Sequence, residues 1–237
     1  MSAQIWIITG TDTGVGKSIF TAWLARFLRE GGVNIAVCKP VCSGGRDDAR
    51  LLRTAIGGSL TLDEINPWHF RAPLAPLLAA RAEGKCVRLP EVVAHINALA
   101  RRCDVLLVES AGGLLSPLGE GFDTRHLIAQ LRAAPVIVAA NRLGVINHLR
   151  LTLEALPAAA ARRARVVLMN PRRSDASTRT NAGLLGEFFD PARILVLPWL
   201  PSPVSEKSFR DQRVLKGLKK HFWSPFVCLS AMHRGDR

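Results

Sequence analysis

The chain has 237 residues, of which 48% are apolar and 22% charged. This balance suits a folded domain with a sizeable core and argues against a disordered basic protein. No apolar run approaches the length of about eighteen residues that a bilayer-spanning helix needs, and the chain opens without a basic segment before its first apolar run. We therefore expect neither a membrane span nor a secretory signal, and we expect a cytoplasmic protein.

The net charge of +13 has two interpretations. A basic surface is a common signature of a nucleic-acid or anionic-membrane partner. However, Arg supplies 25 of the 32 basic residues and is scattered over many segments. We therefore favour an arginine-rich background, with no membrane partner and no nucleic-acid partner expected, and keep a nucleotide-dependent DNA-binding or partner-binding switch as the alternative.

Short aliphatic runs alternate with longer stretches rich in Ala, Leu and Arg, which is the pattern of βαβ units and a parallel sheet. Helices are predicted over Ile19–Arg29 and Glu91–Arg101, from Asp47 onward, and after a cap at Asn147. The predicted strands are Ile5–Thr9, Ala36–Lys39, Val105–Glu109, Val136–Ala140, Val166–Met169 and Ile194–Leu197. This order predicts an α/β fold over residues 1–206, with a doubly wound, mainly parallel sheet flanked by helices.

Residues 207–237 differ from the rest of the chain. They carry eight basic and two acidic residues. Val214, Leu215, Leu218 and Phe222 recur at a spacing that places them on one face of a helix. We predict a basic amphipathic helix and a loose end, separate from the domain over residues 1–206.

A phosphate-binding loop is predicted directly after the first strand. The run Gly10-Thr11-Asp12-Thr13-Gly14-Val15-Gly16-Lys17-Ser18 leads into a helix, so backbone N–H groups and the positive end of the helix dipole face the same anion. Lys17 can reach the β- and γ-phosphates, and the hydroxyl of Ser18 can bind Mg²⁺. The usual pattern has Gly at position 11, where this chain has Thr. The fold is therefore expected to be P-loop NTPase-like.

One residue of this loop bears on the DNA-binding alternative. ATPases that partition DNA have a similar fold, and their loop carries a second lysine five residues before the loop lysine. The corresponding residue here is Asp12. The loop therefore does not support a member of that class.

Three charged residues are candidates to complete the site. Glu109 ends a predicted strand and precedes small residues, so it is placed to act as a metal ligand at the carboxyl edge of the sheet. Lys39 ends another strand, and at that edge it would stabilise an anionic substrate or transition state. Asp48 opens the next helix, where it or Asp47 can cap the helix or reach the metal.

Several groups of residues follow one another along the chain between about residues 4 and 206. They are Thr9–Lys17, Lys39–Val41 with Ser43–Gly44, Asn66–Pro67 with Phe70 and Pro73, Val108–Glu109 with Ala111–Gly113, Leu143–His148 with Leu151–Thr152, and Pro198–Leu200. Together these groups resemble dethiobiotin synthetase. The resemblance implies an ATP- and Mg²⁺-dependent cyclo-ligase of biotin biosynthesis. Such an enzyme converts 7,8-diaminopelargonic acid and CO₂ to dethiobiotin, ADP and phosphate, through a carbamate and a carbamic-phosphoric anhydride.

The resemblance also implies roles for particular residues. Lys39 and Lys17 would be catalytic, and Ser18, Asp48 and Glu109 would hold Mg²⁺. Thr13, Ser43 and Asn147 would contact substrate, and the loop of Asn147 would lie at a homodimer interface, completing the partner's site. Residues that would bind the nucleotide are Gly14, Val15, Gly16, Lys17, Ser18, Ile19, Asp48, Glu109, Ser110, Ala111, Gly112, Asn170, Pro198, Trp199 and Leu200.

The chain departs from the family pattern at several positions. Ser110 replaces a Gly that usually follows the Glu, and a side chain there would strain the backbone if φ were positive, or crowd the substrate. Leu74 and Leu77 stand where small polar residues or His are usual, and Pro171 follows Asn170 where Asp is common. A related enzyme with an altered substrate is therefore a second alternative.

Overall fold

The computed structural model describes residues 3–201, 209 and 211–223. A parallel sheet of six strands lies at its centre, in the order β2-β5-β1-β6-β7-β8. The strands are β1 (Gln4–Gly10), β2 (Ile35–Cys38), β5 (Val105–Gly113), β6 (Ala134–Ala140), β7 (Arg165–Met169) and β8 (Ile194–Leu197). All six strands predicted from the sequence are therefore confirmed, and the parallel sheet and α/β class with them.

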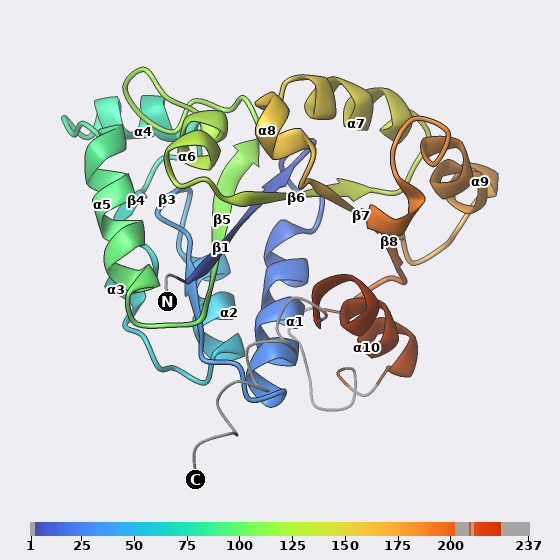
Figure 1. The fold of residues 1–237 in the computed structure, drawn as a ribbon. Helices are drawn as coiled ribbons and strands as arrows, with labels where there is room; N and C mark the ends of the chain where they lie inside the picture. Colours follow the sequence, from blue (N-terminus) through green and yellow to red (C-terminus); the bar gives the residue numbers. More distant parts are fainter. Residues whose placement is uncertain (1–2, 202–208, 210, 224–237) are drawn as a thin grey trace, which may run out of the picture.

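Helices cover both faces of this sheet (Figure 1), so its central strands are buried on both sides and consist of continuous aliphatic runs. The helices α1 (Lys17–Glu30), α2 (Asp47–Ala55) and α10 (Gln212–Leu218) lie on one face. On the other face are α6 (Thr124–Gln130), α7 (Val145–Glu154) and α8 (Ala158–Ala161), while α5 (Leu89–Ala100) packs against α6 and β5. The remaining helices are α3 (Leu62–Ile65), α4 (Pro76–Ala82), α9 (Ala176–Leu185) and the 3₁₀ turn η1 (Pro191–Arg193).

A second, two-stranded parallel sheet was not predicted. It pairs β3 (Val41–Ser43) with β4 (Trp68–Phe70). Each strand has three residues, which is too short to show a periodic pattern in the sequence. The first strand of this small sheet, β3, follows β2 and carries the chain from Lys39 toward α2.

The cap predicted at Asn147 was wrong, and of the two roles offered for Asp47 and Asp48, capping does not occur. Helix α7 begins after Gly144, whose φ of 89° is easily adopted by glycine, so Asn147 lies within the first turn. Helix α2 begins after Arg46, and neither Asp47 nor Asp48 caps it. Both carboxylates instead lie in the first turn, where they interact favourably with the helix dipole.

The amphipathic helix predicted near the end of the chain is present as α10, followed by the π-helical turn η3 (Lys219–Trp223). The buried side chains of α10 and η3 are part of the core. The centroid of the Phe222 ring lies 4.8 Å from that of the Trp6 ring and 5.6 Å from that of the Phe20 ring. Leu215 is partly buried. The predicted loose end lies outside the described residues, and the domain boundary at residue 206 stays a prediction. In the part of the chain that is described, no helix has the length and apolar character needed to cross a bilayer.

Because Phe222 is fully buried between α1 and the sheet, we expect Phe222→Ala to lower the free energy of unfolding by about 3 kcal/mol, through lost burial and a residual cavity. Phe188→Ala is the matched control, since Phe188 is 54% exposed, and it should change stability by less than about 1 kcal/mol. Urea denaturation measures both. Equal stabilities of Phe222→Ala and the wild type would show that this segment does not support the fold.

Candidate active site

The loop between β1 and α1 has the conformation expected of a phosphate-binding loop. Gly14 and Gly16 have φ of 73° and 98°, and Gly16 is the N-cap of α1. Glycine is favoured at both positions because other residues rarely adopt such angles. A Cβ at Gly10 would lie 2.9 Å from both the Asp12 carbonyl oxygen and Val15 Cγ2. Gly10 is therefore required for close packing under the loop.

Lys17 is folded back over this loop. Its Nζ donates a hydrogen bond of 2.8 Å to the Asp12 carbonyl oxygen, and the side chain is largely buried. Burial lowers the pKa of Lys17, and the carboxylate of Glu109 opposes this shift. The ammonium is thus held over the loop that precedes α1, where a phosphate chain would complete its hydrogen bonding.

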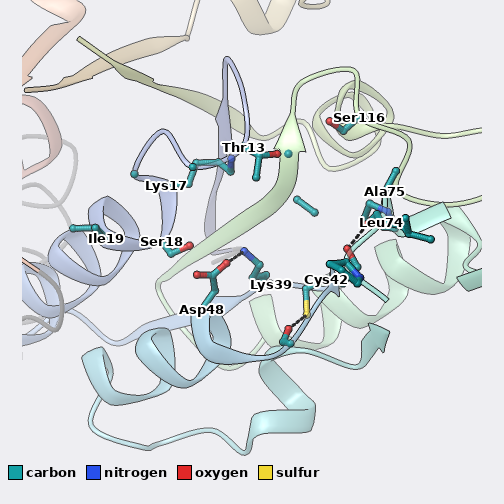
Figure 2. Close-up of a pocket in the computed structure, with 18 residues that line it drawn as sticks. Thr13, Lys17, Ser18, Ile19, Lys39, Cys42, Asp48, Leu74, Ala75 and Ser116 are labelled. Carbon is teal, nitrogen blue, oxygen red and sulfur yellow. Dashed lines mark hydrogen bonds and ion pairs between the residues drawn. The ribbon is translucent and has the colours of Figure 1, made fainter. Parts of the chain in front are cut away.

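Lys39, Asp48, Glu109 and Ser18 meet at the carboxyl edge of the sheet, as their positions in the sequence predict; Figure 2 shows the contact of Lys39 with Asp48. Lys39 Nζ donates to Asp48 Oδ2 at 2.5 Å and to Glu109 Oε1 at 2.7 Å. Ser18 Oγ donates to the same Glu109 oxygen at 2.6 Å. One cluster therefore joins α1, α2, β5 and the end of β2.

The charges in this cluster stabilise one another. Burial disfavours the charged form of Lys39, but Glu109 and Asp48 outweigh it and hold the pKa of Lys39 above its ordinary value. Partial burial likewise raises the pKa of Asp48, and Lys39 more than reverses this, so the pKa of Asp48 is lowered. Lys39 and Asp48 are therefore both charged at neutral pH.

The cluster has the donors that a hard divalent cation requires. Glu109 has no exposed surface, and its Oε2 has no hydrogen-bond partner among the described residues. A buried carboxylate oxygen without a partner is costly. Together with Asp48 and the hydroxyl of Ser18 it offers oxygen ligands, and Mg²⁺ is commonly held by one or two carboxylates together with substrate phosphates. These residues fit Mg²⁺.

A cavity of about 870 Å³ opens beside this cluster (Figure 2). Many residues predicted for the site line it: Thr13, Gly14, Gly16, Lys17, Ser18, Ile19, Lys39, Ser43, Asp48, Ala111 and Gly112. Val15 and Glu109 are buried and do not line it. The phosphate loop therefore faces Lys39 and Ser43 across one cavity of a size suited to small ligands.

Part of the wall was not predicted from the sequence. Cys42, Gly45, Ala75, Pro76 and Ser116 also line the cavity. Figure 2 shows Leu74 and Ala75 in the wall opposite Lys17, and Ser43 Oγ donates a hydrogen bond of 2.5 Å to the Leu74 carbonyl oxygen. Cys42 lies in β3, and the other residues lie in loops or helix ends that carry no motif. At Leu74 the chain departs from the family pattern.

The serine at position 110 does not strain the backbone. Among the described residues other than glycine, only Arg132 has a positive φ. The Ser110 side chain is buried beside β1, where its Oγ donates to Thr9 Oγ1 at 3.2 Å. By contrast, Gly112 has a φ of 68°, and a Cβ there would collide with Ser116. Of the two, Gly112 is the position where glycine is required.

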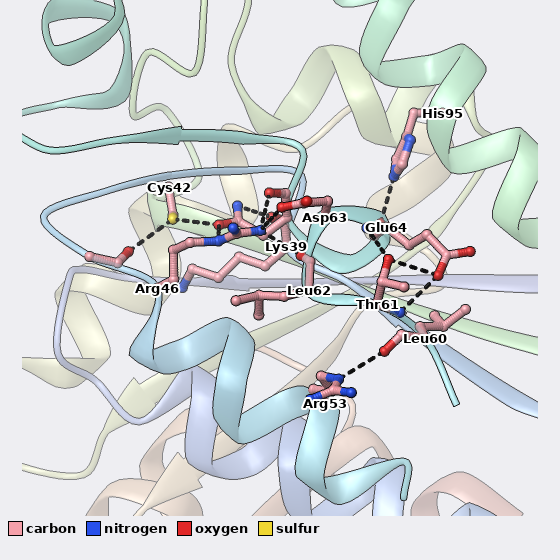
Figure 3. Close-up of polar contacts among 12 residues, drawn as sticks. Lys39, Cys42, Arg46, Arg53, Leu60, Thr61, Leu62, Asp63, Glu64 and His95 are labelled. Atoms are coloured by element: carbon pink, nitrogen blue, oxygen red, sulfur yellow. Dashed lines mark hydrogen bonds and ion pairs between the residues drawn. The ribbon is translucent and has the colours of Figure 1, made fainter. Parts of the chain in front are cut away.

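A layer of polar contacts holds the segment that carries Lys39 and Asp48 (Figure 3). The fully buried Asn66 donates from Nδ2 to the Lys39 carbonyl oxygen at 2.7 Å. Arg46 Nη2 donates to the Leu62 and Asn66 carbonyl oxygens at 2.7 and 2.9 Å and pairs with Asp63. This layer ties the start of α2 to α3, and so fixes the distance between Lys39 and Asp48.

Other predicted residues lie away from this cavity. Asn170 follows β7, next to Met169, which lies 3.3 Å from where a Cβ of Gly16 would be. Asn170 Oδ1 accepts a hydrogen bond of 2.8 Å from Asn141 Nδ2. Pro198–Leu200 follow β8, with Trp199 exposed. Asn147 lines a separate hollow formed by α7 and α9. Within one chain, Asn147 is thus not part of the site around Lys39.

The chain resembles known proteins over nearly its whole length. A family model described as an AAA domain matches residues 4–207. The ATP-dependent dethiobiotin synthetase BioD of Akkermansia muciniphila is 38% identical over 211 residues, covering 89% of this chain and 96% of the relative. This chain belongs to the dethiobiotin synthetase family. The enzyme of the same name from Anaeromyxobacter dehalogenans is 41% identical over a match that covers 82% of this chain and 89% of the relative. The enzyme of the same name from Bacillus subtilis is 39% identical over 154 residues, which cover 63% of this chain and 67% of the relative.

These matches confirm the resemblance seen in the sequence. They also support the P-loop NTPase-like fold, since the matched region spans the whole central sheet. Members of this family with these names are ATP-dependent synthetases. A DNA-partitioning ATPase is therefore not the class to which this chain belongs.

Proposed function

We propose that the protein is an ATP-dependent dethiobiotin synthetase. It converts 7,8-diaminopelargonic acid, CO₂ and ATP to dethiobiotin, ADP and phosphate. The observation that carries this proposal is the single cavity in which the phosphate loop faces Lys39 and Ser43, with Glu109 and Asp48 between them. The family of the relatives gives the substrate class.

The triphosphate of ATP lies along the loop from Gly14 to Ile19, with Lys17 at its β- and γ-phosphates. Ser110, Ala111 and Gly112 lie at the end of β5 beside this loop, where the small residues Ala111 and Gly112 let the phosphates approach the backbone. Asn170 and Pro198–Leu200 border the adenine. The position of Asn170 next to Met169, which packs against Gly16, supports this assignment.

Ser18, Asp48 and Glu109 hold Mg²⁺, which, when bound, neutralises charge on the phosphates. The unpartnered oxygen of Glu109 supports this role. The Lys39 ammonium now lies between two of these carboxylates, at 2.5 and 2.7 Å. A cation held by these carboxylates would compete with Lys39 for them, which would leave the charge of Lys39 available to the substrate.

The substrate lies between Lys39 and the wall formed by Thr13, Ser43 and Leu74. One amine of the diamine adds to CO₂ and loses a proton, giving a carbamate. A carbamate oxygen then attacks the γ-phosphorus, and ADP leaves. The second amine attacks the carbonyl carbon of this anhydride, loses a proton and expels phosphate, which closes the ring. Lys17 and Lys39 reduce the repulsion between carbamate and triphosphate as these two anions meet.

Purified protein incubated with ATP, Mg²⁺, bicarbonate and the diamine should form dethiobiotin and ADP in equal amounts, because each anhydride releases one ADP as it forms and one dethiobiotin as it closes. Mass spectrometry and an ADP assay measure the two products. Removal of Mg²⁺ with EDTA should abolish turnover. Normal ATP binding without ureido product would contradict the proposal. ATP-dependent binding of duplex DNA would favour a switch instead, and turnover of another diamine would favour an altered substrate.

Lys39→Ala should lower kcat by at least about a hundredfold, because it removes the positive charge opposite the phosphate loop. Its effect on ATP affinity should be small, since Lys17 and the loop backbone remain. Lys85→Ala, which removes an exposed lysine elsewhere, is the matched control and should retain full activity. Steady-state kinetics and ATP titration measure the two effects, and wild-type kcat in Lys39→Ala would remove Lys39 from the mechanism.

We also propose that the enzyme is a homodimer in which the loop Gly144–His148 faces the partner's substrate cavity. The apolar surface around Asn147 supports this: Leu143 is 85% and Leu151 58% exposed, and both line a hollow of about 570 Å³ with Asn147. Exposed leucines that gather beside a hollow are typical of protein interfaces.

Leu143→Glu should convert the dimer to a monomer, because it places a charge in the apolar interface, and should lower activity along with it. Val196→Glu, a similar change at a partly exposed position of the outer strand β8, should leave the dimer intact. Analytical ultracentrifugation of both variants and the wild type tests this. A monomeric wild type with full activity would rule out the dimer.

We also propose a cytoplasmic location and a synthetase domain that ends at residue 206. A cytoplasmic location agrees with use of the ATP pool there and with the free thiols of the four described cysteines; cell fractionation tests it. We assign the synthetase chemistry to residues 1–206, which agrees with a family match that ends at residue 207. Residues 207–237 are basic in composition, and their described elements α10 and η3 pack into the core of that domain.

A further inference from the structure

A second large cavity lies at the opposite edge of the sheet from the phosphate loop. It has a volume of about 990 Å³ and includes Gln4, Ala134 and Arg165, which begin β1, β6 and β7. In parallel sheets of this kind the catalytic site is at the carboxyl edge, so this cavity is separate from it. Its most frequent lining residue is arginine: Arg101, Arg132, Arg162, Arg163, Arg165 and Arg193.

These arginines are widely spaced in the sequence but meet in the fold. Arg101, Arg132, Arg163 and Arg193 are separated by 31, 31 and 30 residues. Each lies in the connection that leads from a helix into β5, β6, β7 or β8. In a parallel sheet all such connections lie at the amino edge, so one arginine per connection produces a cluster there. We refer to these six residues as the arginine pocket.

The positive charge of the arginine pocket is largely uncompensated. Among the described residues, Asp190 is the single carboxylate that pairs with any of the six arginines, through Arg193 Nε at 3.0 Å. Arg165 is partly buried, with its guanidinium 4.9 Å from the centroid of the Trp6 ring. Burial and the nearby charge of Arg193 lower the pKa of Arg165. Guanidinium groups held together in this way repel one another, and a bound anion would relieve the repulsion.

Arg132 occupies a position where glycine is usual. It follows the C-cap of α6 with a φ of 48°, and the next residue closes the helix with a hydrogen bond of 3.1 Å from Ala133 N to the Ile128 carbonyl oxygen. Glycine is the common residue at this left-handed position. Arg163 Nη1 donates to the Arg132 carbonyl oxygen at 3.0 Å. The chain thus accepts backbone strain that places a guanidinium at this cavity, and such strain often marks a functional position.

We propose that the arginine pocket binds a small molecule that carries a diphosphate or polyphosphate group. Guanidinium groups bind phosphate oxygens through two parallel hydrogen bonds, and several of them, contributed by separate connections, match a ligand with several anionic oxygens. The cavity volume lies near the upper end of the range for small-molecule sites. A concave pocket suits a compact ligand better than the convex backbone of duplex DNA.

The test uses inorganic tripolyphosphate as the probe, titrated by calorimetry into the full-length protein. The wild type should bind two equivalents, one at the phosphate loop and one at the arginine pocket. Arg162→Gln/Arg163→Gln should bind one. Arg88→Gln/Arg179→Gln, which removes the same charge from exposed positions outside the pocket, should still bind two. Comparison with a nucleoside triphosphate shows whether a base adds affinity at the second site.

Arg132→Gly separates binding from folding. This substitution should raise the Tm by about 2–4 °C, because it relieves the strained backbone. It should also lower the affinity for tripolyphosphate at the arginine pocket about tenfold, because one charge-assisted contact is lost. One equivalent in the wild type, or two in Arg162→Gln/Arg163→Gln, would overturn the proposal. Duplex DNA that binds the wild type, is displaced by tripolyphosphate and fails to bind this double variant would also overturn it, in favour of a nucleic-acid partner.

Discussion

The site depends on the fully buried carboxylate of Glu109. Burial of a charge costs several kcal/mol unless partners compensate it, and here Lys39 and Ser18 both donate to a single carboxylate oxygen. This requirement fixes the end of β2 and the start of α1 against β5. Because the second oxygen has no partner among the described residues, the cluster is only partly satisfied, as is appropriate for a site that receives a cation and a triphosphate.

The central sheet could be predicted because its strands are buried on both faces. A run such as Val105–Val108 is uniformly aliphatic, and its boundaries follow from the change in composition. The end of β5 could not be predicted, since it extends through Gly112, a residue that favours turns in isolation. β3 and β4 were missed for a related reason: they pair with one another over three residues, and this pairing depends on the tertiary position of Asn66 and Arg46.

The charged residues of the site could be predicted because each follows an aliphatic run or a glycine-rich turn, which local spacing reveals. The part of the cavity wall formed by Ala75 and Ser116 could not be predicted, because the loops that carry these residues reach the cavity only through tertiary packing. The network of Asn66 and Arg46 is similar: it contacts mainly backbone carbonyl groups, and such contacts leave no pattern in the sequence. The chemical groups of the site are therefore more predictable from the sequence than the surfaces that hold them.

The net charge likewise shows a difference between what the order of residues reveals and what the fold brings together. In the sequence the arginines are dispersed, which favoured a compositional explanation. In the fold, one connection after another brings an arginine to the amino edge, so that residues about 30 positions apart share one cavity. The two edges of the sheet then differ in electrostatics. At the carboxyl edge Lys39 is paired with Glu109 and Asp48, whereas at the amino edge most guanidinium groups have no described carboxylate partner. Dispersion along the chain is therefore no argument against a localised positive surface in a protein built from repeated βα units.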